Sequence, residues 1–121
     1  MRSEQGQATV ELALLLPLLA FLTLGLVQLG LIAHDRVELT HTAREAVRTA
    51  VVDSSTAAVR AAATKASSLD PSRLSTTVSA AGSDGDVTVT VTYLAPTDVP
   101  LVGALVGDVT LRERFVGRAE Q

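Results

Sequence analysis

The sequence predicts an α+β fold, in which a long N-terminal helix precedes a second, shorter helix and a small antiparallel sheet of about three strands. The prediction rests on an uncharged apolar run from Leu12 to Ala33, helical apolar spacing beyond it, and strict alternation of Val and Thr from Val87 to Tyr93. The 121 residues suffice for one modest domain. We therefore divide the chain into a leader (1–6), an apolar helix (7–33) and a helix-plus-sheet domain (34–121).

The apolar run is long enough to cross a membrane. From Leu12 to Ala33 a helix would rise about 33 Å, and the hydrocarbon core of a bilayer is about 30 Å thick. Pro17, Gly25 and Gly30 lie inside the run, but membrane helices tolerate both residue types. The run also exceeds the roughly 7–15 apolar residues of a cleaved secretory signal. We predict a single-pass transmembrane helix, and a plain uncleaved signal anchor is the alternative.

The helix is expected to continue beyond the membrane as an amphipathic extension. Apolar residues recur there at helical spacing: Leu39, Ala43, Ala46, Val47, Ala50 and Val51. This stripe would pack on strands of the same chain or on neighbouring subunits, and periodicity does not distinguish the two. A break at Asp53–Thr56 offers a new N-cap, and Ala57–Ser68 reads as a second helix that ends before Asp70-Pro71.

The remainder is predicted to form strands. Val87, Val89, Val91 and Tyr93 alternate with threonines, as in a half-buried strand. Leu74, Val78 and Ala80 indicate a preceding strand, joined to it by the turn residues 82–85. Val109, Leu111 and Phe115 indicate a third strand, whose apolar face is interrupted by Glu113. Residues 95–107, rich in Pro and Gly, are expected to form a loop with a short helical turn.

Composition excludes several classes of function. The net charge of −3 disfavours binding to nucleic acid. The chain has no cysteine, so disulfides and thiolate chemistry are absent, and aromatic residues make up only 2%, too few for base stacking. We expect no nucleic-acid partner, no small-molecule substrate and no cofactor.

Catalytic or metal-binding machinery is not expected. His34, Glu38, His41 and Glu45 share one helical face and could in principle bind a metal, but a solvated face is the better interpretation. Residues 82–86 lack the ligand pattern of a calcium loop and are interpreted as a turn. The Ser and Thr residues belong to no nucleophile motif. We therefore predict that the protein is not an enzyme and has neither catalytic residues nor a metal site.

The junction between the leader and the apolar run is more specific. Glu11 lies at the edge of the run, where a carboxylate is tolerated better than at the bilayer centre and is favoured by the helix dipole. It is either an interfacial acid or a group placed to pair with a cation when helices bundle. Three segments resemble the TadE-like family, the minor pilins or pseudopilins of tight-adherence (type IVb) pilus systems: Gly6–Leu14 with Pro17, Val27–Gly30 and Ala43–Arg48.

The resemblance implies a set of sites and partners. A prepilin peptidase would cut between Gly6 and Gln7, and Glu11, five residues past Gly6, would pair during assembly. The expected partners are this peptidase, other pilins, the pilus assembly platform and membrane lipid. The implied function is that of a structural or assembly component, with an anchored accessory or adhesion module that never polymerises, or a small subunit of a membrane enzyme complex, as alternatives.

The resemblance also implies a topology. Prepilins insert with the leader in the cytoplasm, so the C-terminal domain would be extracytoplasmic and could enter a pilus. Counting basic residues alone predicts the reverse, because Arg2 faces Arg36, Arg44 and Arg48 across the apolar run. We follow the resemblance.

Overall fold

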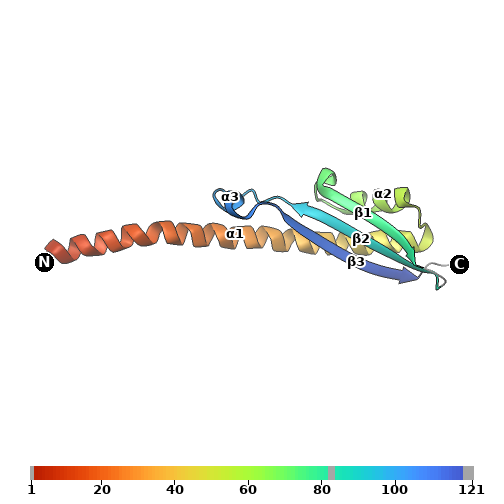
Figure 1. The fold of residues 1–121 in the computed structure, drawn as a ribbon, viewed down its shortest axis with the longest axis horizontal. Coiled ribbons are helices and arrows are strands. Elements are labelled where there is room, and N and C mark those ends of the chain that lie inside the picture. The colour runs from red at the N-terminus through yellow and green to blue at the C-terminus, as the bar shows by residue number, and fades with distance from the viewer. Residues whose placement is uncertain (1, 82–83, 119–121) are drawn as a thin grey trace.

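The computed structural model describes residues 2–81 and 84–118, and it confirms the predicted α+β class (Figure 1). In chain order the elements are α1 (Arg2–Val52), α2 (Thr56–Ala66), a 3₁₀ turn η1 (Pro71–Arg73), β1 (Leu74–Ala81), β2 (Asp86–Ala95), α3 (Val102–Val106) and β3 (Val109–Arg118). The strands form one antiparallel sheet in the order β1-β2-β3. Two residues of the predicted β1–β2 turn, Gly82 and Ser83, lie outside the described residues.

Helix α1 is a single unbroken rod that runs through both the apolar span and the extension. Its 51 residues correspond to about 77 Å at 1.5 Å per residue. Pro17 lies inside the helix without ending it. The N-terminal half projects beyond the rest of the molecule, whereas the C-terminal half lies along the sheet (Figure 1).

The C-terminal half of α1 packs on strands of its own chain, which resolves the alternative left open by periodicity. Its buried residues Leu39, Ala43, Ala46 and Ala50 join the core with residues of α2 and β2. Thr42 is also fully buried, and its hydroxyl donates to the Glu38 carbonyl at 2.9 Å. Because its polar group is satisfied within the helix, Thr42 can lie in the apolar stripe.

Strand β2 lies at the centre of the sheet and shows the predicted alternation. Val87, Val89, Val91 and Tyr93 are buried, and Thr90 and Thr92 are only half-buried. Side chains alternate between faces along a strand, so the apolar face covers α1 and the threonines lie on the opposite face.

Strand β3 explains the acid that interrupts its apolar face. Glu113 pairs with Val91 in the register, so its side chain lies on the same face as the core residues. Its Oε1 lies 3.2 Å from Nη2 of Arg36 on α1. The charge is therefore compensated at the edge of the helix–sheet interface.

Helix α2 begins as predicted but ends two residues earlier than the sequence pattern suggested. Ser55 is the N-cap, and its hydroxyl accepts from the Ala58 amide at 3.4 Å. At the other end, the Ser68 amide donates to Oε1 of Glu38 at 3.0 Å. This contact with α1 draws the chain out of the helix after Ala66.

Candidate functional site

The N-terminal segment of α1 carries the three residues that the sequence singled out. Gly6, Gln7 and Glu11 all lie in its exposed first turns. Nε2 of Gln7 donates to Oε1 of Glu11 at 3.4 Å. Residues four apart meet on one helix face, so the structure brings the Glu11 carboxylate toward the position where an amine on Gln7 would lie after cleavage.

The Gly6–Gln7 peptide bond belongs to a helical turn without tertiary support. A Cβ built on Gly6 would meet no atom within 4 Å, and the neighbouring described side chains are exposed. The first four amides of a helix also lack intrahelical partners. A peptidase that needs an extended substrate would have to unwind only this end of α1.

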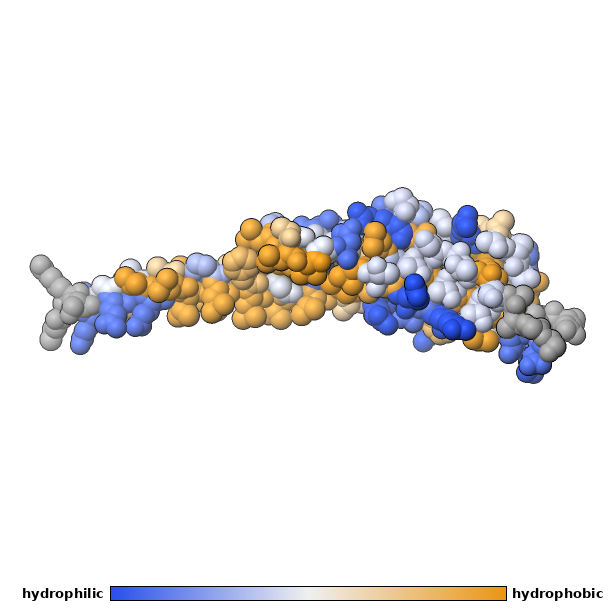
Figure 2. Space-filling model, in the orientation of Figure 1, coloured by the Kyte–Doolittle hydropathy of each residue, from blue (hydrophilic) through white to orange (hydrophobic). Residues whose placement is uncertain are grey.

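The apolar span leaves its side chains unburied. Large apolar side chains are exposed all along it, including Leu14, Leu18, Phe21, Leu22, Leu26 and Leu29. Among the described residues, α1 is the helix long and apolar enough to cross a membrane. Figure 2 shows the resulting apolar band between a polar N-terminal tip and the more polar domain. This arrangement is compatible with a single-pass membrane anchor.

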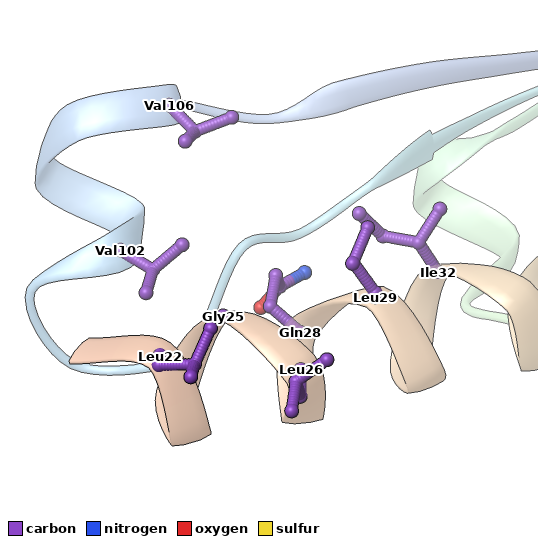
Figure 3. Close-up of a pocket in the computed structure, with 8 residues that line it drawn as sticks. All are labelled: Leu22, Gly25, Leu26, Gln28, Leu29, Ile32, Val102 and Val106. Atoms are coloured by element: carbon purple, nitrogen blue, oxygen red, sulfur yellow. The ribbon is translucent and has the colours of Figure 1, made fainter. Parts of the chain in front are cut away.

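A groove between the span and α3 is a feature that sequence analysis missed. It has a volume of about 350 Å³ and is lined by Leu22, Gly25, Leu26, Gln28, Leu29 and Ile32 of α1 and by Val102 and Val106 of α3 (Figure 3). Gln28 is 4% exposed, and neither polar atom of its amide has a hydrogen-bond partner among the described residues. The apolar sequence of α3, set between Pro100 and Gly107, was the available signal.

The loop that carries α3, residues 96–108, is closed at its base. The Thr97 amide donates to Oδ1 of Asp108 at 3.4 Å, and its hydroxyl donates to the Gly107 carbonyl. Arg73 Nη1 lies 3.3 Å from Oδ2 of Asp108. A Cβ on Gly103 would collide with the Thr97 carbonyl, so the two sides of the loop approach as closely as glycine permits. These contacts fix α3 against the span.

The four polar residues of the helical face after the span are placed apart in function. Glu38 accepts the Ser68 amide, and this hydrogen bond holds the pKa of its carboxyl below the ordinary value. His41 and Glu45 line a shallow groove with Lys65 of α2. Within residues 2–81 and 84–118, no three His, Cys, Asp or Glu side chains gather as a metal site would require.

Comparison with known proteins identifies the N-terminal part of the chain. No curated protein and no solved structure matches it. A family model described as TadE-like protein matches residues 6–48, which include Gly6, Glu11, the apolar span and most of the extension packed on the sheet. The resemblance predicted from the sequence motifs is confirmed over this segment, and residues 6–48 are a TadE-like domain.

Proposed function

We propose that this protein is a minor pilin or pseudopilin-like component of a tight-adherence (type IVb) pilus or a related secretion system. The observation that carries the proposal is the division of α1. Its C-terminal half is buried in the protein's own domain, whereas its N-terminal half offers exposed apolar side chains over many turns. A TadE-like protein fits association with such a pilus.

The exposed half of α1 can be satisfied in two environments. In the membrane, lipid covers its apolar side chains, and in a bundle of like helices, neighbouring subunits cover them. The continuous helix couples these states to the folded domain, since no break separates the span from the extension. The protein can thus be stored in the bilayer and then assembled without refolding.

Glu11 supplies the specificity of assembly in this proposal. After cleavage behind Gly6, the new amine on Gln7 and the Glu11 carboxylate would lie one helical turn apart. Each could pair with its counterpart on a neighbouring subunit. A carboxylate that enters a water-excluding bundle without a cation carries a desolvation penalty of several kcal/mol, so a subunit docked out of register would be rejected.

A charge-neutral variant tests this role. Glu11→Gln keeps the shape of the side chain and removes its charge, so membrane levels and leader cleavage should stay normal while co-purification with the other pilins is lost. Glu4→Gln is the matched control, because Glu4 is also exposed on α1 but lies in the segment that cleavage would remove. If Glu11→Gln associates with its partners as wild type does, Glu11 is only an interfacial acid.

The proposed topology places the leader in the cytoplasm and the helix-plus-sheet domain outside it. A phosphatase reporter fused after Gln121 should then be active. An inactive fusion at normal expression would contradict both this topology and the pilin proposal. The anchored accessory module would share the topology but retain its leader and bind no pilins.

A further inference from the structure

The α3 loop (residues 96–108) lies beside the part of α1 that is expected inside the bilayer. The groove between them is lined by α1 residues from Leu22 to Ile32 (Figure 3). Ile32 is next to the end of the apolar run at Ala33, and Leu22 lies about 16 Å deeper along the helix axis. If α1 spans the membrane, the docked loop must meet the same leaflet.

The outer surface of the loop suits that environment. Leu101, Leu105 and Val106 are exposed, with Leu105 at 78%. Figure 2 shows this apolar surface continuing from α1 onto the loop. Leu101 also has a positive φ of 71°, an uncommon conformation for a non-glycine residue. Such strain persists only where surrounding structure enforces it, and here it accompanies an outward-facing leucine.

The groove itself lacks a polar partner. The Gln28 amide is buried with both polar atoms unpaired among the described residues, and it points into the space between α1 and the loop (Figure 3). A buried amide without a hydrogen bond is unfavourable, so a partner from outside the chain is expected. Phospholipid ester carbonyls lie at the boundary of the hydrocarbon region and accept hydrogen bonds, and acyl chains would fit the apolar lining.

We propose that the α3 loop is a second membrane contact, which lies at the headgroup–hydrocarbon boundary of the leaflet nearest the domain, with phospholipid covering Leu101, Leu105 and Val106 and entering the Gln28 groove. The boundary position follows from charge, because Asp98 within the loop is exposed and an ionised carboxylate is disfavoured at the bilayer centre. The domain would then be held at a defined height and tilt on the membrane by two contacts. This inference requires only that α1 spans a bilayer, and it does not rest on pilus assembly.

The absence of native cysteines allows a direct test with single-cysteine variants of the full chain. Leu105→Cys is the test position, Leu14→Cys marks the span, and Val116→Cys marks an apolar but water-exposed site on β3. All three side chains are exposed in the structure, so the substitutions should not disturb the fold. Each purified variant is reconstituted into phosphatidylcholine vesicles and treated with a membrane-impermeant maleimide, with denatured protein defining complete labelling.

The proposal predicts that Leu105→Cys reacts at least about tenfold more slowly than Val116→Cys, because a thiol in lipid does not ionise. It should resemble Leu14→Cys. Labelling of Leu105→Cys at the rate of Val116→Cys would overturn the proposal, as would rapid labelling of Leu14→Cys. The measurement is repeated at a lower protein-to-lipid ratio. Protection that persists supports lipid as the occupant, and protection lost on dilution shows that a second copy covers the loop and overturns the proposal.

Discussion

Replacing Leu39 with Ala is the perturbation that most sharply tests how α1 is held to the sheet. Leu39 is 0% exposed at the centre of the core, where its neighbours along the same helical stripe are alanines. Alanine side chains have no rotamers with which to fill a vacated volume, so a cavity should remain. Leu→Ala substitutions in cores cost 2–5 kcal/mol, and we expect about 3 kcal/mol here.

The loss can be followed through the only tyrosine of a chain that has no tryptophan. Tyr93 is buried in the same core, so its fluorescence reports unfolding of the domain when the full chain is heated in mild detergent. For a domain of this size, 1 kcal/mol shifts Tm by about 4–8 °C, so Leu39→Ala should lower Tm by about 12–24 °C.

Val37→Ala provides the matched control on the same helix. Val37 is 71% exposed, and its truncation should change stability by less than about 0.5 kcal/mol. If Leu39→Ala melts with Val37→Ala, the stripe does not pack on its own sheet in the monomer. That result would refute the packing argument and return the stripe to contacts between subunits.

Three further predictions use the same melting assay. Glu38→Gln should cost less than about 1 kcal/mol at neutral pH, because the group is largely solvated. Since the Ser68 amide lowers the folded-state pKa of Glu38, its stabilisation is present above the ordinary value of 4.5 and is lost as pH falls through the folded pKa, so the wild-type and variant curves should converge in acid; a constant difference would contradict the assignment. Arg36→Ala should destabilise the domain by leaving Glu113 unpaired, and adding Glu113→Val should recover the loss; failure to recover would exclude the ion pair as the cause. Ser55→Ala should cost about 1 kcal/mol through loss of the α2 N-cap, and an unchanged Tm would count against the cap.

The elements with a clear period could be predicted from the sequence. The Val/Thr alternation identified β2 because one face of that strand is buried and the other is not, and side chains change face at every residue. The stripe from Leu39 to Ala50 identified the extension for the same reason at the helical period. Capping chemistry located the start of α2 at Ser55.

Features made by distant segments could not be predicted in this way. The partner of Glu113 lies on α1, far away in the sequence, so its acid read only as an interruption of the strand. The docking of α3 on the span depends on the closed base of its loop and on a glycine that permits close approach. Gln28 therefore read as one polar residue in an apolar run, although α3 buries it.

Processing of the N-terminus tests the central claim most directly. The intact mass and N-terminal sequence of the protein should be read from membranes of cells with and without an active prepilin peptidase, with Gly6→Leu as a cleavage-blocked control. A pilin-like component should begin at Gln7 when the peptidase is present and at Met1 when it is absent or when Gly6 is replaced. A wild-type protein that retains Met1 beside an active peptidase would contradict the proposal and identify the span as an uncleaved anchor.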